Sequence, residues 1–236
     1  EGTFGVVRPG RLRSSGDDVA IKVCKNGQQQ TLLNEMITLL ALQDRSRHLC
    51  KLLGVAKDEQ GCWALVMPKY VRNLGSENAV TADRIPAVLT GIARALRIVH
   101  ATGLIHMDVK EANILIDDEK EAVLCDFGCA IGQDVQPKPR RHGTAVYRAP
   151  EVRSTSYDER VDVYSFGKVI GAMKDRLNDQ SLHETLEELS RDLTHPDPDR
   201  RNSSAETASS SMKVFHSHDR AKPVFHSAKD CASCHA

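Results

Sequence analysis

Residues 104–128 read LIHMDVKEANILIDDEKEAVLCDFG, and this stretch decides the fold of the 236-residue chain. Two short apolar runs, residues 113–116 and 122–125, read as β-strands on either side of an acidic turn. The loops beside them carry polar side chains that packing in a buried segment does not explain. These side chains offer two carboxylates, an ammonium group and an amide: Asp108, Lys110, Asn113 and Asp126. Such a set suits Mg²⁺ and phosphate oxygens, so the sequence predicts a site for both.

Written as H-x-D-x-K-x-x-N followed by D-F-G, the stretch resembles the catalytic and metal-binding loops of the eukaryotic protein kinases. The resemblance implies an α+β, two-lobed protein-kinase-like fold, in which a small β-rich N-lobe and a larger helical C-lobe enclose a cleft for ATP. It also implies that Asp108 accepts or orients the proton of the substrate hydroxyl and that Lys110 reaches the γ-phosphate. Asn113 and Asp126 would hold Mg²⁺.

Three motifs further along the chain match the same family and follow its order. GTAVYRAPE at residues 143–151 matches G-T-x-x-Y-x-A-P-E, and VDVYSFG at residues 161–167 matches the D-x-x-S-x-G start of a helix. DPDRR at residues 197–201 resembles D-P-x-x-R, whose arginine pairs with the glutamate of A-P-E, here Glu151. In the family, a threonine at the place of Thr144 bridges to the catalytic loop. Together with D-x-K, this threonine resembles serine/threonine kinases rather than tyrosine kinases.

Two motifs near the N-terminus resemble the nucleotide-binding strands of the family. Residues 1–7, EGTFGVV, match the second half of a G-x-G-x-x-G-x-V loop, so the first strand looks truncated; a plain β-turn is the alternative. Residues 18–23, DVAIKV, match V-A-I-K. A lysine in such a strand is usually solvated, but the resemblance implies that Lys22 holds the α- and β-phosphates. Glu35, on a helix expected over residues 28–42, would pair with Lys22 and orient it.

The linker after the apolar run 62–67 resembles the hinge between kinase lobes, where backbone groups would bind adenine. Pro68 cannot extend that run within a central strand, and Met67 would be the gatekeeper. The nucleotide-binding residues that the resemblance implies are Gly2, Gly5, Val7, Ala20, Lys22, Glu35, Met67, Lys69 and Tyr70.

Other patterns complete the expected layout of the chain. Residues 48–56 form a further β-like run. Residues 81–101 read as a helix with its apolar side chains on one face and with Thr81 as its N-cap. The boundaries that follow are a kinase-like domain at 1–212, made of an N-lobe at 1–67, a hinge at 68–71 and a C-lobe at 72–212, and then a flexible tail at 213–236.

Two departures from the family pattern concern the segment after D-F-G. Met107 stands where the family usually has an arginine that anchors a phosphorylated activation loop. Residues 129–143 contain no Ser, Thr or Tyr. The segment thus lacks a residue that could be phosphorylated, and the chain lacks the arginine that would bind the phosphate. We therefore expect an enzyme that is not switched by phosphorylation within that segment. The alternative is a pseudokinase that acts as a nucleotide-binding or scaffolding module.

The last residues carry a C-x-x-C-H sequence formed by Cys231, Cys234 and His235. This pattern is the attachment signature of c-type haem, and the upstream His216, His218 and His226 could supply a second ligand. A metal-binding tail is another interpretation. The motif is short and nothing else in the chain indicates haem attachment, so we expect a flexible end rather than covalent haem.

Composition limits the classes of partner. Lys plus Arg and Asp plus Glu are both 32, which gives no electrostatic reason to expect nucleic acid or an anionic membrane as the main partner. The expected partners are ATP and a protein with Ser or Thr hydroxyls, and the oligomeric state is left open. No apolar run is long enough to span a bilayer, and residues 1–7 do not resemble a signal peptide. Seven scattered cysteines favour a reducing compartment, so we expect a cytoplasmic protein, with the nucleus as the alternative.

Overall fold

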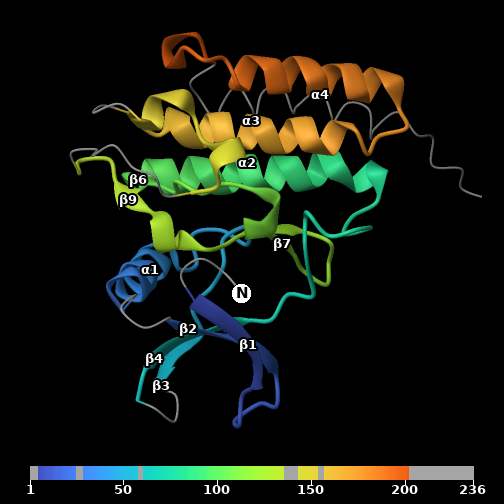
Figure 1. Ribbon diagram of the computed structural model, residues 1–236. Coiled ribbons are helices and arrows are strands. Elements are labelled where there is room, and N and C mark those ends of the chain that lie inside the picture. The colour runs from blue at the N-terminus through green and yellow to red at the C-terminus, as the bar shows by residue number, and fades with distance from the viewer. Residues whose placement is uncertain (1–4, 25–28, 58–60, 136–142, 154–156, 202–236) are drawn as a thin grey trace, which may run out of the picture.

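The computed structural model has two lobes, a β-rich one at the bottom of Figure 1 and a helical one at the top. It describes residues 5–24, 29–57, 61–135, 143–153 and 157–201. The expected α+β architecture, with a small β-sheet lobe and a larger helical lobe, is confirmed. The expected tail at 213–236 lies outside the described residues. Within the described residues, no helix combines the length and the apolar character that a membrane span requires.

The small lobe consists of one antiparallel sheet and one helix. The sheet has the order β1-β2-β4-β3. Its strands are β1 (Gly5–Arg11), β2 (Asp18–Cys24), β3 (Gly54–Lys57) and β4 (Trp63–Pro68). Helix α1 (Gln29–Leu42) buries residues at intervals of three and four, which is the spacing of one helical face: Leu32, Glu35, Leu39 and Leu42. The helix expected over 28–42 is therefore confirmed from Gln29 onward.

The expectation of a strand over residues 48–56 was wrong for most of that run. Only Gly54–Lys57 pairs in the sheet as β3. Leu49 instead forms an isolated parallel bridge with Leu124 of the large lobe. The Cys50 amide donates to the Leu124 carbonyl at 2.9 Å, and the Leu124 amide donates to the His48 carbonyl at 2.9 Å. The segment between α1 and β3 is thus hydrogen-bonded to the large lobe.

Three helices lie in layers above the small lobe in Figure 1. They are α2 (Ile85–Ala101), α3 (Arg160–Lys174) and α4 (Gln180–Leu193). Helix α2 begins at Ile85, not at Thr81, because residues Ala82–Arg84 form a separate 3₁₀ turn, η1; Thr81 makes no side-chain capping bond. Pro86 in the first turn suits this start, since the amide that proline lacks would have no partner there.

Short strands hold the loops that face the small lobe. Strands β5 (Arg72–Asn73), β7 (Ile114–Ile116) and β8 (Ala122–Leu124) form a three-stranded sheet in the order β5-β7-β8. Strand β6 (Leu104–Ile105) pairs with β9 (Ile131–Gly132). The catalytic-loop residues lie between β6 and β7, and Asp126 lies between β8 and β9. Both polar segments predicted from the sequence therefore begin and end in hydrogen-bonded strands.

The end of the described chain is attached to the large lobe by Arg201, of which 2% is exposed. Its guanidinium binds both oxygens of the Glu151 carboxylate. It also donates to the carbonyls of His195 at 2.6 Å and of Pro196 at 3.1 Å. The ring of Tyr164 lies 4.9 Å from the guanidinium carbon. The predicted pairing of Arg201 with Glu151 is confirmed.

Candidate active site

The catalytic loop and the segment after residue 143 meet at Asp108. The Lys110 ammonium lies 2.7 Å from one oxygen of the Asp108 carboxylate and 2.9 Å from the Thr144 hydroxyl. The Thr144 amide donates to the other Asp108 oxygen at 2.9 Å. Asn113 donates its side-chain amide to the Asp108 carbonyl at 2.8 Å. Residues predicted from two separate motifs, three from H-x-D-x-K-x-x-N and Thr144 from G-T-x-x-Y-x-A-P-E, therefore form one hydrogen-bonded group around the Asp108 carboxylate.

A buried aspartate of α3 positions this loop. Asp162 is 0% exposed and accepts from the backbone amides of His106 at 2.7 Å and Met107 at 2.8 Å. The ring of His100 lies 3.0 Å from the same carboxylate. Burial alone would raise the pKa of Asp162, but His100 and the backbone donors outweigh burial and lower it. The charged carboxylate thus fixes the backbone just before Asp108.

A second cluster joins the two lobes through Lys22 of β2. Its ammonium lies 2.6 Å from the Glu35 carboxylate of α1 and 2.7 Å from the Asp126 carboxylate. Burial acts to lower the pKa of Lys22, but the two carboxylates outweigh it and raise that pKa. Burial acts to raise the pKa of Asp126, but Lys22 has the larger effect and lowers that pKa. Lys22 and Asp126 are therefore both charged at neutral pH, as binding of phosphate and metal requires.

The residues expected to hold Mg²⁺ fit such an ion. Asp126 has 28% of its side chain exposed, whereas the Lys22 side chain beside it is 9% exposed. Since Lys22 binds one carboxylate oxygen, Asp126 keeps the other for a cation, and Asn113, which uses its NH₂ group on Asp108, keeps its amide oxygen. One carboxylate and one amide suit Mg²⁺, which takes further ligands from phosphate and water. Among the described residues, no group of three or more His, Cys, Asp or Glu side chains forms a preassembled metal site.

Several of the other expected nucleotide-binding residues lie on the same sheet as Lys22. In the sheet register, Val7 of β1 is paired with Lys22, and Ala20 of β2 with Met67 of β4. A Cβ atom on Gly5 would lie 2.6 Å from the Val23 carbonyl, so only glycine fits there. Gly2 lies outside the described residues.

The hinge residues are described, and their side chains point in different directions. The Lys69 ammonium lies 3.1 Å from Asp18 at the sheet edge, so only the Lys69 backbone is left for adenine. Tyr70 and Met67 are partly buried against the main core. The haem-like residues Cys231, Cys234 and His235, and the histidines upstream, lie outside the described part of the chain.

Met107 lies in an apolar cluster, which explains how the chain tolerates the loss of the usual arginine. Met107 is 8% exposed and has a left-handed backbone with φ of 70°. The cluster consists of Ile105, Met107, Cys129, Ile131, Ala149, Val152 and Val161. It joins the catalytic loop to both ends of the segment that follows D-F-G. The apolar packing of Met107 thus takes the place of the charge pair that the usual arginine makes with a phosphorylated loop.

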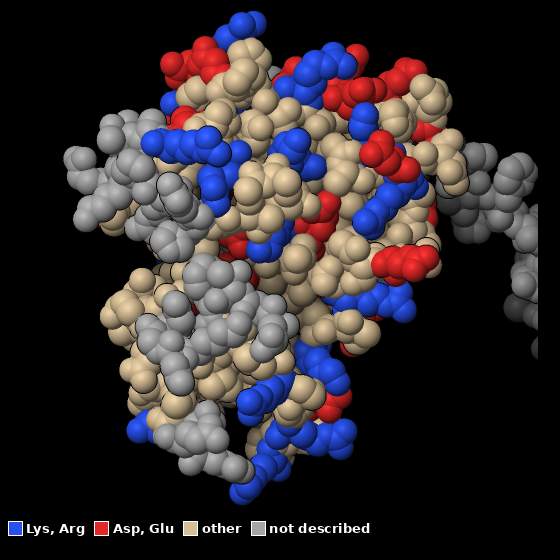
Figure 2. All heavy atoms as spheres, in the orientation of Figure 1, with Lys and Arg blue, Asp and Glu red and all other residues tan. Residues whose placement is uncertain are grey.

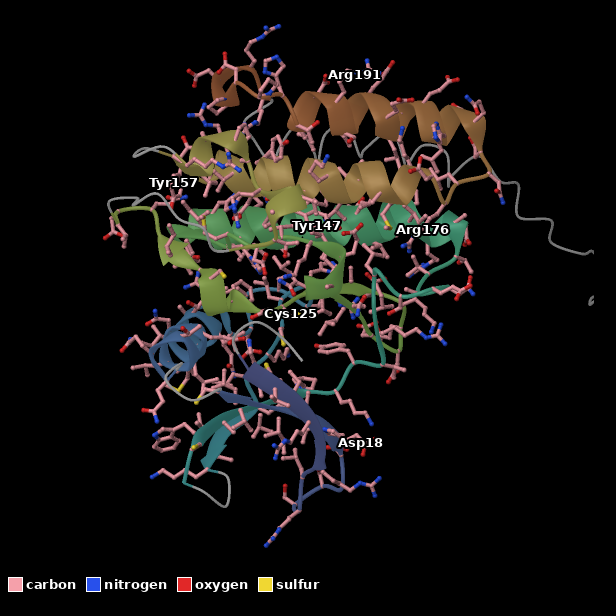
Figure 3. The ribbon with its side chains drawn as sticks, viewed as in Figure 1. Asp18, Cys125, Tyr147, Tyr157, Arg176 and Arg191 are labelled. Carbon is pink, nitrogen blue, oxygen red and sulfur yellow. The ribbon has the colours of Figure 1, made fainter. Side chains whose placement is uncertain are left out.

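Sequence reasoning missed three residues of the site: His100, Glu111 and Asp162. Asp162 was visible as the aspartate of D-x-x-S-x-G, and Glu111 as an acidic residue directly after Lys110. Glu111 accepts a hydrogen bond from the Tyr147 hydroxyl, which links the catalytic loop to the A-P-E segment a second time. In Figure 3, Tyr147 lies on the large lobe and Cys125 near the junction of the lobes. No short sequence motif predicts a contact between residues that lie this far apart in the sequence.

Comparison with known proteins agrees with this geometry. A family model described as "Protein kinase domain" matches residues 1–196. The chain belongs to the protein kinase family, and its resemblance to that family is thereby confirmed.

Several curated relatives are protein kinases by name. The chain is 30% identical over 191 residues to "PR5-like receptor kinase" of Arabidopsis thaliana, covering 72% of this chain and 28% of the relative. It is 36% identical over 184 residues to "L-type lectin-domain containing receptor kinase VIII.1" of the same plant, covering 72% and 26%. "Cell division control protein 2 homolog 1" of Trypanosoma brucei brucei is 30% identical over 188 residues, covering 73% and 61%. The chain thus spans about a quarter of the length of the two receptor kinases.

Proposed function

We propose that the chain is a serine/threonine kinase that uses Mg²⁺ and ATP to phosphorylate protein hydroxyls. The observation that carries this proposal is the bonding of Lys110 to both Asp108 and Thr144. A lysine and a threonine in these roles resemble the serine/threonine class. The charged Lys22 and Asp126, on opposite sides of the junction between the lobes, support nucleotide binding at the same place.

The proposed mechanism rests on positioning and charge. Asp108 accepts a hydrogen bond from the substrate hydroxyl and orients its oxygen toward the phosphorus. Lys110 and Thr144 hold the Asp108 carboxylate in one orientation, and Lys110 carries a positive charge beside the transferred group. Lys22 binds phosphate oxygens while Glu35 keeps its ammonium in place. Bound Mg²⁺ supplies charge compensation on the phosphates, with Asp126 and Asn113 as the residues that hold it. The bond between the γ-phosphorus and the oxygen bridging to the β-phosphate breaks as the γ-phosphoryl group moves to the hydroxyl oxygen; Asp108 takes up the hydroxyl proton, and ADP leaves.

The proposal includes activity without phosphorylation of residues 129–143. In the family, an arginine before the catalytic aspartate holds a phosphorylated loop, but here Met107 packs with Cys129 and Ile131. Apolar packing is independent of phosphate, so the loop needs no modification to stay docked. The location in the cell that fits best is the cytoplasm or the nucleus, as the cysteine pattern indicates.

A kinase assay on the purified chain tests this function. We expect Mg²⁺-dependent transfer of labelled phosphate from ATP to a mixture of Ser/Thr peptides, and little transfer to Tyr peptides. Asp126→Asn removes the carboxylate charge at the metal, so activity falls by about 100-fold or more. Asp118→Asn, an exposed change in the β7–β8 turn, serves as the matched control and leaves activity unchanged.

Three outcomes separate the proposal from its alternatives. Nucleotide binding without transfer, in folded protein, would identify a pseudokinase. Transfer that is lost after phosphatase treatment, with the fold intact, would contradict activity without phosphate. A Soret band in the purified protein would indicate haem at Cys231, Cys234 and His235.

A further inference from the structure

Two cysteines lie side by side where the small lobe is hydrogen-bonded to the large lobe. The Cys50 amide donates at 2.9 Å to the Leu124 carbonyl, which belongs to the peptide bond that leads into Cys125. Because Leu49 and Leu124 form a parallel bridge, Cys50 and Cys125 are the next pair in the same register. Residues in register across a parallel pair have their side chains on the same face, and the two chains are about 4.8 Å apart. The two thiols therefore lie on the same side of the junction between the lobes.

The packing around these residues agrees that the two thiols are neighbours. Cys50 belongs to the main apolar core, and Cys125 packs against the same core. Burial raises the pKa of the Cys125 thiol, and the nearby Cys50 raises it further. Cys129, which is closer to Cys125 in the sequence, packs in the other cluster with Met107 and Ile131. The fold thus pairs Cys125 with Cys50 rather than with Cys129.

The spacing of the two chains suits a disulfide bond. A disulfide joins residues whose Cα atoms lie about 4.4–6.8 Å apart, and the spacing of a parallel pair falls within this range. In the reduced protein, the Cys125 thiol donates to the Asn113 carbonyl at 3.2 Å and the Cys50 thiol to the Lys51 carbonyl at 3.8 Å. A thiol is a weak donor, so the loss of these two hydrogen bonds opposes a disulfide only slightly.

The two thiols differ in their access to small reagents. Cys125 is partly exposed, whereas only 4% of Cys50 is exposed. A small oxidant therefore meets Cys125 first, and Cys50 is held beside it to react with the oxidised sulfur. Because burial raises the pKa of both thiols, little thiolate is present at neutral pH, and we expect the oxidation to be slow.

We propose that Cys50 and Cys125 form a reversible oxidation site, at which a hydroperoxide joins the two lobes through a disulfide bond. The Cys125 sulfur attacks one oxygen of hydrogen peroxide, the O–O bond breaks, and the other oxygen leaves as water with the thiol proton. The Cys50 sulfur then attacks the sulfenic acid of Cys125, the hydroxyl group leaves with the Cys50 proton as a second water, and the S–S bond forms. The two sulfurs together lose two electrons, which reduce the peroxide to water. A thiol such as dithiothreitol or glutathione returns both cysteines to the reduced form.

A disulfide at this position makes the contact between the lobes covalent. It lies beside the hydrogen bonds that Cys50 and Leu124 make, so those bonds open less often while the disulfide is present. It also closes the chain between residues 50 and 125 into a loop, which limits the freedom of the unfolded chain and stabilises the folded protein. Oxidation therefore changes local exchange and thermal stability, and neither effect depends on the proposed kinase function.

The test treats the purified chain with excess hydrogen peroxide, alkylates the remaining thiols in denaturant, and maps the tryptic peptides without reductant. We expect the peptide with Cys50 to be linked to the peptide with Cys125, and dithiothreitol to separate the two. Cys125 and Cys129 share one tryptic peptide, so fragmentation of the linked pair assigns the bond. We also expect the melting temperature to rise by about 5 °C or more. Exchange of the Cys50 and Leu124 amides with deuterium should slow by about tenfold.

Cys50→Val keeps a buried apolar side chain and removes one thiol. We expect this variant to lose the linked peptides and the rise in melting temperature, and to retain a sulfenic acid at Cys125 that dimedone labels. The matched control is Cys62→Ser, which removes a partly exposed thiol just before β4 and leaves both effects intact. The peptide map of the unaltered protein decides the question without any variant, so an unstable variant does not affect the result.

Three outcomes overturn the inference. The first is full alkylation of both Cys50 and Cys125 after the peroxide treatment. The second is a bond from Cys125 to Cys129 or to any other cysteine in place of Cys50. The third is a bond between Cys50 and Cys125 that forms as fast in urea-unfolded protein as in folded protein, because the fold would then have no part in pairing them. All three leave the proposed kinase function standing, since no phosphate transfer is measured.

Discussion

Each of the two aspartates of the site is paired with a different lysine. Lys110 holds Asp108 from within the same loop, at 2.7 Å, whereas Lys22 reaches Asp126 from the other lobe. Lys22 also binds Glu35, so three charges from β2, α1 and the loop after β8 share one contact. Because burial strengthens such contacts, one substitution there affects both stability and nucleotide binding.

Lys22→Met leaves Glu35 and Asp126 without their shared cation. We expect unfolding free energy to fall by about 3 kcal/mol, since one partner of a buried group of charges is removed. Affinity for ATP should fall by at least about tenfold. Urea unfolding and nucleotide titration measure the two effects. Lys69→Met is the control, because its pair with Asp18 is exposed to solvent, which screens the attraction between the two charges. Equal effects of the two changes would argue against the buried cluster.

Met107→Arg restores the arginine that is usual in the family, and it should harm this chain. The new guanidinium would enter the apolar cluster around Cys129 and Ile131 with no phosphate to bind. We expect a loss of about 3 kcal/mol in unfolding free energy. Met107→Leu, which keeps the apolar contacts, should cost less than about 1.5 kcal/mol. An arginine variant as stable as the unaltered protein would show that the cluster does not hold the loop.

At the scale of elements, helices were easier to predict than strands. An apolar face at helical spacing predicted helices over residues 28–42 and 81–101, and the structure has α1 and α2 within these ranges. The run 48–56 has the composition of a strand, but most of it is used to bridge Leu124 in the other lobe. A short apolar run does not reveal which partner it will pair with, because that depends on chain far away.

The contact between α3 and α4 depends on glycine. A Cβ atom at Gly167 would lie 2.8 Å from the Leu193 Cβ and 2.9 Å from the Thr194 Cγ2, and the helices cannot separate without losing buried leucines. We expect Gly167→Ala to cost about 1–3 kcal/mol in urea unfolding. The control is Gly54→Ala at the start of β3, where a Cβ atom would meet nothing within 4 Å. It should change stability by about 1 kcal/mol or less. The reverse order of the two variants would contradict close packing at Gly167.

At the scale of the whole molecule, charge is balanced overall and unevenly placed. Figure 2 shows Lys and Arg more often than Asp and Glu on the small lobe, at the bottom, while both signs alternate over the large lobe. The acidic side chains of the candidate site, in contrast, are mostly buried. The side chains that meet around Asp108 could be predicted because each belongs to a short motif. The contact between Glu111 and Tyr147 could not be predicted, since the two residues are 36 positions apart.

Acid should destabilise the protein through Asp162. Its pKa in the folded state lies below its ordinary value of 3.8, so its stabilising effect is complete above pH 3.8 and is lost as pH falls through the lowered pKa. Asp162→Asn should therefore be less stable than the unaltered protein at pH 7, by about 2 kcal/mol or more, and the difference should shrink below pH 3.8. Urea unfolding between pH 7 and pH 3 measures this. Asp118→Asn, an exposed change, should show a difference that is small at every pH; a similar trend for both would assign the pH dependence to other groups.

The bridge between Leu49 and Leu124 has a mechanical consequence. The lobes are joined covalently along residues 68–71, and the bridge adds a second attachment beside this linker, because Leu49 lines the same pocket as Pro68 and Tyr70. Once the ion pair of Lys22 with Asp126 is released, these two attachments leave the small lobe free to turn only about the line that passes through them. The small lobe can therefore rock toward and away from the catalytic loop, carrying Lys22 with it, while twisting or sliding would first break the hydrogen bonds of His48 and Cys50. The small lobe thus opens and closes by rotation about a single axis.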